Sequence, residues 1–148
     1  MSLIDLVHEN IVKTPMAATD KAEALRELVQ VLADAGQTQS YEAVLEAVQD
    51  REDKMSTGLQ DGIAVPHGKT HAVDNLKLVI GIAPDGIEFD ALDGEPSKLF
   101  FMLVAPPDQA GPHVQALAEI AKLAQSKAFC KALIAADNAG EVVELIKE

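Results

Sequence analysis

The residues best suited to chemistry lie between Arg51 and His71, in the stretch REDKMSTGLQDGIAVPHGKTH. Histidine is the side chain whose ordinary pKa lies closest to neutrality, so the ring of His67 can act as a nucleophile, a base or a metal ligand. Pro66 and Gly68 predict a tight corner around this ring, because proline fixes the backbone and glycine lets another backbone segment approach. These three chemistries set the question for the rest of the chain.

Groups suited to holding a phosphoryl group precede this corner. Ser56 and Thr57 offer hydroxyl and amide donors, and Arg51 offers a guanidinium fork that matches phosphoryl oxygens. Positioning and electrostatic stabilisation are what phosphoryl transfer chiefly requires, so these donors favour a phosphate-accepting histidine. Arg51 is also expected near the C-terminal end of a helix, where its charge would suit the helix dipole and its role would be structural.

A metal site is the first alternative at His67. His67 and His71 are four residues apart and Asp74 lies nearby, but this spacing makes a ligand pair only on a helix. The proline and glycine that flank His67 argue against a helix, and the chain has no H-E-x-x-H motif or cysteine cluster. We therefore expect no metal at this site, and we expect His71 and His8 to be surface residues.

A Ser-His-Asp hydrolase is the second alternative, with Ser56 as its nucleophile. The chain lacks the G-x-S-x-G elbow that exposes such a serine in many hydrolases. This absence makes the hydrolase the weakest of the three readings.

Composition and charge narrow the class of protein. The chain has 148 residues, a length that suits one domain, and its apolar residues are mostly aliphatic, with only 3% aromatics. The net charge is −12 and no Lys/Arg cluster is visible, so nucleic acid is not an expected partner.

Compartment signals are few. The lone Cys130 excludes an internal disulfide and fits a reducing compartment, with structural burial as its default role. No signal peptide or membrane span is visible, which predicts a soluble, cytoplasmic protein without direct membrane insertion.

Periodicity and capping signals predict the elements that position the site. The predicted helices are a turn at 3–7, a helix with a capping box at Asp20 and Glu23 that ends at Gly36, a helix from Ser40 to Arg51, a helix that has Pro112 at its first position and His113 in its first turn, a helix from Ser126 to Ala136, and a last helix from Asn138 to Lys147. The expected apolar side of the helix with His113 comprises Val114, Leu117, Ala118, Ala121, Leu123 and Ala124.

Strands are expected between these helices. They cover an edge strand at 11–12, a strand at 62–65 that Pro66 ends just before His67, a strand at 76–83, a turn at 84–86, a short strand at 87–92 and a central strand at 98–105. The order of elements predicts an α/β fold: a mixed sheet of about five strands flanked by helices, in one domain that spans 1–148.

Three segments carry a resemblance to a known family. STGLQDGIAVPHGK, IEFDALDGEPSKLFFMLVAPPD and AGPHVQALAEIAKL resemble the fructose/mannitol-type enzyme IIA domain of the bacterial phosphoenolpyruvate-dependent sugar phosphotransferase system, including its nitrogen-regulatory members. The resemblance covers about residues 3–146 in the same element order. It implies a cytoplasmic carrier without cofactor that takes a phosphoryl group from the histidine-containing phosphocarrier protein and passes it to a cysteine of an enzyme IIB domain.

The resemblance also assigns roles to individual residues. By that likeness His67 is the phosphorylated residue, His113 is the second active-site histidine, and Arg51, Ser56 and Thr57 help to bind the phosphoryl group. Because no IIB, transporter or phosphocarrier segment is attached, the partners are expected to be separate proteins. The chain departs from the family pattern at Gln60, where a glycine is common, and this leaves the backbone shape of that turn open.

A regulatory module is the alternative function. A phosphoryl group adds roughly −1.5 to −2 units of charge, enough for one phosphorylation state to bind regulatory target proteins and the other to release them. The sugar is not specified by this domain, because the resemblance implies that the sugar meets the IIB and membrane components.

Overall fold

Strand β5 (Ser97–Ala105) is the strand on which the sheet is built. In the computed structural model, which describes residues 3–147, β5 pairs antiparallel with β4 (Lys77–Ile87) on one side. On its other side it pairs parallel with the short strands β2 (Ile63–Ala64) and β3 (His67–Lys69). A two-residue edge strand, β1 (Val12–Lys13), runs parallel to β4 and completes a mixed sheet of five strands, as predicted.

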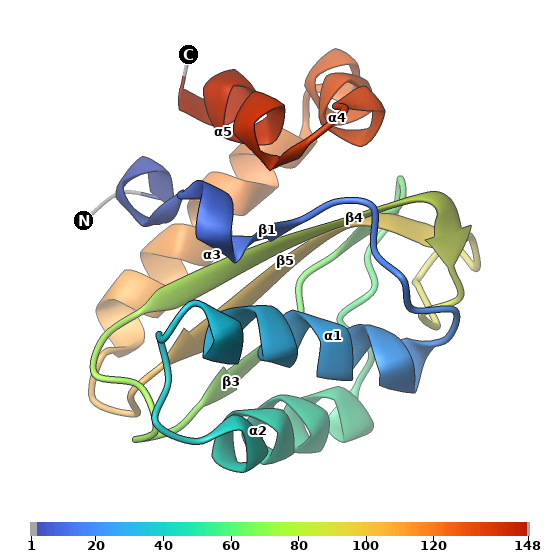
Figure 1. The fold of residues 1–148 in the computed structure, drawn as a ribbon. Helices are drawn as coiled ribbons and strands as arrows, with labels where there is room; N and C mark the ends of the chain where they lie inside the picture. Colours follow the sequence, from blue (N-terminus) through green and yellow to red (C-terminus); the bar gives the residue numbers. More distant parts are fainter. Residues whose placement is uncertain (1–2, 148) are drawn as a thin grey trace.

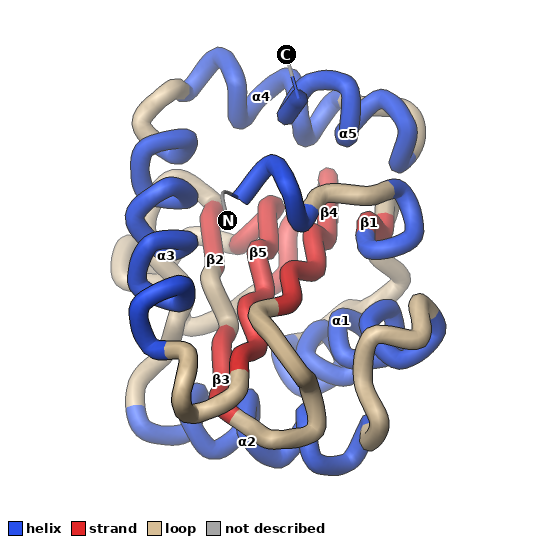
Figure 2. Tube along the Cα trace, turned by 90° about the vertical axis from the view of Figure 1, so that its left-hand side faces the viewer, coloured by secondary structure: helices blue, strands red, loops and turns tan. Residues whose placement is uncertain are grey.

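Two layers of helices cover the sheet (Figure 1, Figure 2). Helices α1 (Lys21–Asp34) and α2 (Tyr41–Lys54) pack on one face. The other face is covered by the short 3-10 helices η1 (Leu3–Leu6) and η2 (Glu9–Ile11) and by the helices α3 (Ala110–Ala124), α4 (Lys127–Ala135) and α5 (Ala139–Lys147). None of the helices in residues 3–147 is long and apolar enough to cross a membrane.

The predicted N-caps set where four helices begin. The side chains of Asp20, Ser40, Ser126 and Asn138 each accept a hydrogen bond from the backbone N–H three residues later, at 2.8–3.2 Å. The capping box at Asp20 is only half formed, because the Glu23 carboxylate accepts from the backbone and hydroxyl of Thr19 instead.

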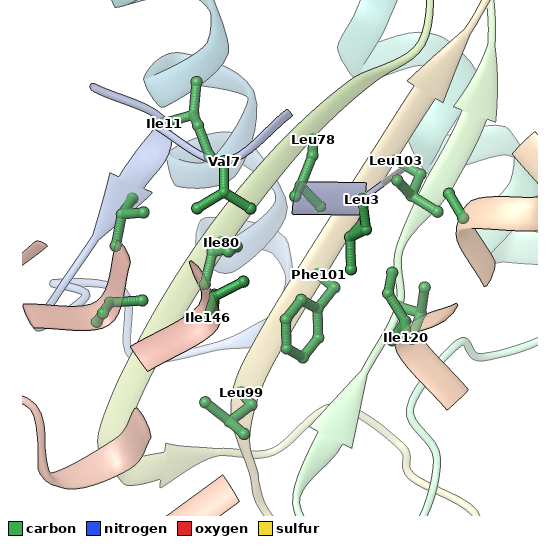
Figure 3. Packing of buried hydrophobic residues seen from close by; sticks show 14 of the residues in the cluster. Leu3, Val7, Ile11, Leu78, Ile80, Leu99, Phe101, Leu103, Ile120 and Ile146 are labelled. Carbon is green, nitrogen blue, oxygen red and sulfur yellow. The ribbon is translucent and has the colours of Figure 1, made fainter. Parts of the chain in front are cut away.

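Side chains of β5 alternate between the two cores. Leu99, Phe101 and Leu103 belong to the core beneath α3, α4 and α5, which Figure 3 shows from close by. The residues between them, Phe100 and Met102, belong to the core beneath α1 and α2. Burying each such side chain stabilises the fold by about 1.5–3 kcal/mol, and this strand is buried on both faces as its continuous apolar run predicted.

The predicted turn at 84–86 and strand at 87–92 were wrong. Strand β4 continues through these positions to Ile87, with an irregular register between Ile82 and Ile87. Gly86, with a φ of 81°, adopts the left-handed conformation there, so the strand bends without ending. The chain then leaves the sheet and packs on the loop before β2, where the Leu92 N–H donates to the Gly58 carbonyl at 3.1 Å.

Strand β2 ends before Pro66 and His67 lies just past it, as expected, but His67 is also the first residue of a further short strand, β3, that was not predicted. Pro66 has no N–H to donate, but its carbonyl accepts from Leu103 N at 3.0 Å. This bond keeps the backbone beside β5, so parallel pairing resumes with His67 opposite Leu103. The proline interrupts one edge of the sheet without ending it.

Helix α3 begins earlier than predicted, and its apolar side was predicted only in part: Leu117, Leu123 and Ala124 pack against the core, but its most buried positions are others. It starts at Ala110, so Pro112 is its third residue. Its buried positions are His113, Ala116 and Ile120, whereas Val114 of the predicted apolar side is 64% exposed. Hydrophobicity alone misplaced the face because the position that points toward the sheet at the first turn is occupied by a histidine.

Candidate functional site

The ring of His67 is held by a backbone carbonyl two residues earlier in the chain. Its Nδ1 lies 2.9 Å from the carbonyl oxygen of Val65, and because a carbonyl only accepts, the hydrogen sits on Nδ1. The lone pair of the neutral ring is then on Nε2. A histidine held in this tautomer presents Nε2 as a nucleophile or base.

Gly68 brings helix α2 directly against the strand that carries this ring. A Cβ atom at Gly68 would lie 2.9 Å from the carbonyl carbon of Ala47 and from the backbone nitrogen of Val48. The expectation that glycine permits another backbone to approach here is confirmed, and the backbone that approaches is that of α2. This contact sets the middle of α2 against β3, and Arg51, about one turn further along α2, lines the same pocket as His67.

Four of the five predicted site residues line one pocket of about 250 Å³, and the fifth, His113, is not among its lining residues. Its lining includes Arg51, Ser56, Thr57 and His67, together with apolar side chains of the 55–65 loop, the 88–96 segment and α3. Arg51 lies in the last turn of α2, and its Nη1 donates to the carbonyl of Met55 at 2.8 Å. Arg51 therefore donates to a carbonyl just after the helix end and also lines the pocket. A structural role at the helix end and a role in phosphoryl binding are thus compatible.

His113 is buried beside His67 although the two are far apart in sequence. The ring centroids are 5.3 Å apart at an interplanar angle of 74°, and His113 is only 4% exposed (its helix α3 runs beside β3 in Figure 2). Burial, and then the nearby charges of His67 and Lys69, lower the pKa of His113 to about 4. At neutral pH this ring is uncharged, and its buried Nδ1 has no hydrogen-bond partner within residues 3–147.

The two hydroxyl groups of the turn before β2 are already engaged within the protein. Ser56 Oγ donates to the Phe89 carbonyl at 2.8 Å and accepts from Gly58 N at 3.1 Å. Thr57 donates both its backbone N–H and its hydroxyl to the carboxylate of Glu52. The prediction that Ser56 and Thr57 hold a phosphoryl group stays a prediction.

Glu52 is a residue that the sequence reasoning missed. It is 4% exposed and pairs with Lys21 Nζ at 3.0 Å. The signal available in the sequence was its position next to Arg51 in the last turns of α2, which reads as an ordinary exposed helix end. Nothing in the local pattern predicts that the helix turns this carboxylate inward.

The turn at Gln60 does not require a glycine. Asp61 and Gly62 take the left-handed conformation, with φ angles of 61° and 78°, and Gln60 is not among the described residues with positive φ. The Gln60 carbonyl accepts from Ile63 N at 3.4 Å, which closes the turn. The departure from the family pattern is therefore compatible with the turn as it stands.

The alternative chemistries find little support in the geometry. His71, like His8, is exposed, Asp74 pairs with Lys77 at 3.3 Å, and residues 3–147 contain no group of three His, Cys, Asp or Glu side chains placed to hold a metal. Ser56 donates to a backbone carbonyl and not to a histidine, which removes the basis for a hydrolase.

A larger pocket of about 580 Å³ lies against α4, and none of the predicted site residues lines it. Cys130, which lines it, is partly buried, and burial together with the Asp61 carboxylate raises the pKa of its thiol. The protonated thiol agrees with the structural role expected for this cysteine.

Fold and site together define a class of protein: a single-domain α/β sandwich in which two histidine rings lie against each other at one edge of a mixed sheet, and one of them, His67, lines a small pocket. Residues 5–148 match the family model described as "Phosphoenolpyruvate-dependent sugar phosphotransferase system, EIIA 2". The chain belongs to this family, and the resemblance drawn from its motifs is confirmed.

Similar proteins include both sugar-specific components and nitrogen regulatory proteins. The chain is 31% identical to the fructose-specific EIIABC component of Bacillus subtilis (strain 168) over 148 residues, which is 100% of this chain but only 23% of that protein. Nitrogen regulatory protein IIA-Ntr from Neisseria meningitidis has the same fold, with a TM-score of 0.89 and 26% identity over 97% of this chain and 98% of that chain. The complex of enzyme IIAMTL and phosphorylated enzyme IIBMTL from Escherichia coli also shares the fold, with a TM-score of 0.81 and 24% identity over 95% and 96% of the two chains.

Proposed function

We propose that the chain is a phosphohistidine carrier in sugar uptake. Nε2 of His67 accepts a phosphoryl group from the histidine-containing phosphocarrier protein and passes it to an enzyme IIB domain. The observation that carries this proposal is the hydrogen bond of 2.9 Å from Nδ1 to the Val65 carbonyl, which leaves Nε2 unprotonated at the pocket that Arg51 also lines.

Each transfer exchanges one bond to phosphorus for another. The Nε2 lone pair attacks the phosphorus, a new N–P bond forms, and the bond between phosphorus and the donor's histidine breaks with its electron pair returning to that ring. In the second transfer a cysteine thiolate of the IIB domain attacks, an S–P bond forms and the bond to His67 breaks. Neither step needs a cofactor, and both depend on positioning and charge stabilisation.

Arg51 and His113 supply the stabilisation of the transferring oxygens. The guanidinium nitrogens of Arg51 that Met55 does not occupy offer charged donors to two oxygens. His113 is neutral at pH 7, so it donates through one ring N–H without adding a charge that would hold the phosphoryl group too tightly. Ser56 and Thr57 shape the pocket wall, and either hydroxyl reaches an oxygen only by leaving its present acceptor.

A partner protein has to reach this pocket, and its border suits one. Met55, Leu59 and Leu92 line the pocket and are 67%, 38% and 77% exposed, respectively. Exposed apolar side chains around a small polar site are typical of a protein contact surface. The phosphocarrier protein and the IIB domain would occupy it in turn in the cytoplasm, and the complex of a IIA with a phosphorylated IIB from Escherichia coli supports the second of these partners.

Regulation is the second candidate function, and the fold similarity to nitrogen regulatory protein IIA-Ntr favours it. In this case phosphorylation of His67 would add negative charge to the same surface, and target proteins would bind one of the two states. The site chemistry would be unchanged.

The test is phosphorylation driven by phosphoenolpyruvate, with enzyme I and the phosphocarrier protein present. We expect labelling of the wild type and of the control His71→Ala, an exposed histidine outside the pocket, and no labelling of His67→Ala. Full labelling of His67→Ala would overturn the assignment. Addition of a IIB domain then separates the functions: efficient delivery without phosphorylation-dependent binding to other proteins supports uptake, whereas selective binding of a target supports regulation.

A further inference from the structure

A buried carboxylate lies beneath the turn that forms one wall of the His67 pocket. Glu52 is 4% exposed, and its Oε2 accepts from Thr57 N at 2.7 Å while its Oε1 accepts the Thr57 hydroxyl. Burying a carboxylate is costly unless it is paired and hydrogen-bonded, and both conditions are met here.

Lys21 holds this carboxylate from the first turn of α1. Its Nζ lies 3.0 Å from Glu52 Oε2 and 3.3 Å from Asp90 Oδ2, and it sits over the ring of Phe89 at 4.9 Å from the centroid. The carbonyl of Phe89 in turn accepts the Ser56 hydroxyl. Lys21 thereby joins α1, α2 and the segment after β4 around the Ser56–Thr57 turn.

A continuous chain of hydrogen bonds leads from this ion pair to the ring of His67. Glu52 accepts from the Thr57 N–H at 2.7 Å, the Thr57 carbonyl accepts from Val65 N at 3.0 Å, and the Val65 carbonyl holds His67 Nδ1 at 2.9 Å. The chain passes through Thr57 and Val65, each of which uses its N–H for one bond and its carbonyl for the next, so the bonds restrain the backbone of both residues. The last bond selects the tautomer of the ring.

We propose that Glu52, held by Lys21, is a positioning residue for phosphoryl transfer at His67. It touches neither the ring nor the pocket, and it acts by fixing the Thr57 peptide on which Val65 and His67 are aligned. Because the backbone N–H and the hydroxyl of Thr57 both donate to Glu52, the chief role of Thr57 is to connect Glu52 to Val65 and His67. The proposal rests on the proposed function of His67.

The experiment compares Glu52→Gln with Glu27→Gln. Glu27 is a matched control, because its carboxylate also accepts backbone N–H groups, at 2.8 Å from Ala17 and 2.9 Å from Ala18, and pairs with a lysine, but the backbone that it holds is at 17–18 and not in the Ser56–Thr57 turn. We expect Glu52→Gln to lower kcat for phosphorylation by the phosphocarrier protein about 10- to 100-fold with KM nearly unchanged, because a small misalignment of the nucleophile acts on the reaction and not on docking. Glu27→Gln should keep the wild-type kcat.

Lys21→Met adds a second arm. If the pair works as one unit, Lys21→Met lowers kcat to a similar degree, and the double variant Lys21→Met/Glu52→Gln is no slower than the slower single variant. Should Glu52→Gln fail to fold, Thr57→Val replaces it and is expected to lower kcat about tenfold; because the Thr57 hydroxyl also lines the pocket, this variant is judged by the tautomer of unphosphorylated His67 as well as by kcat. Wild-type kcat in the folded variant, or an equal loss in Glu27→Gln, overturns the proposal.

Nuclear magnetic resonance separates this proposal from the proposed function. Ring nitrogen shifts of unphosphorylated His67 should show one tautomer with the hydrogen on Nδ1 in the wild type, and a mixture of tautomers in Glu52→Gln. If the wild type is not phosphorylated at His67, the proposed function fails, and the nitrogen shifts alone then test whether Glu52 positions the His67 ring. A mixture of tautomers in Glu52→Gln supports positioning by Glu52, and an unchanged single tautomer in that variant overturns it.

Discussion

His113 should make the stability of this fold depend on pH in a way that a single variant removes. Its folded-state pKa is about 4 against an ordinary value of 6.5, because burial penalises the charged ring. Between these values the unfolded chain binds a proton that the folded chain excludes. The contribution of neutral His113 is therefore fully present above pH about 6.5 and is lost progressively as the pH falls toward 4.

The size of the effect follows from these two values. One pKa unit corresponds to about 1.4 kcal/mol, so between about pH 7 and about pH 5 the loss amounts to about 1–2 kcal/mol. Urea unfolding of the wild type and of His113→Gln at both pH values measures this loss of unfolding free energy. The difference in unfolding free energy between the two proteins should shift by this amount in favour of His113→Gln at the lower pH.

Carboxylates titrate in the same range, so the comparison needs a matched histidine. His71→Gln removes an exposed imidazole and should leave the pH dependence of the wild type unchanged. A constant free-energy difference between wild type and His113→Gln at both pH values would refute the reasoning. So would a directly measured pKa of His113 near its ordinary value.

Two further predictions concern glycine. Gly68→Ala should lower the unfolding free energy by about 1–3 kcal/mol in thermal or urea unfolding, because its Cβ would meet the backbone of α2 at 2.9 Å, whereas Gly111→Ala, with nothing within 4 Å, should not destabilise; equal stabilities of the two variants would contradict this. Gln60→Gly should lower the unfolding free energy, measured by urea unfolding, by about 0.4–1 kcal/mol. Gln60 does not adopt a positive φ, so glycine brings no relief of strain in the folded state and only adds conformational freedom to the unfolded chain. A more stable variant would show that the turn is strained.

Most of the fold was predictable because local signals and burial agreed. The N-caps at Asp20, Ser40 and Ser126 and the apolar run of β5 are short-range features, and each appears where it was expected. The errors lie where tertiary pairing overrides local preference. Gly86 bends a strand that it was expected to terminate, and pairing with β5 resumes after Pro66 in a short strand that was not predicted.

The proximity of the predicted site residues could be predicted from the motifs, but their internal contacts could not. The motifs brought Arg51, Ser56, Thr57 and His67 together, and the structure gathers them around one pocket. The burial of His113 followed from the rotation of α3, which hydrophobic periodicity misjudged. Glu52 was invisible because its importance comes from partners on other elements, which no spacing along the sequence reveals.

The central place of β5 has a consequence for motion. The strand that carries His67 and the long strand β4 both pair with β5, while η1 and α5 lie on the outer layer over one core. Local opening of a folded protein begins at elements with few buried contacts and reaches central strands last. Fraying of the chain ends would therefore leave the histidine pocket assembled, and amide hydrogens of β5 should exchange with solvent only in the rare openings that also dismantle the pocket.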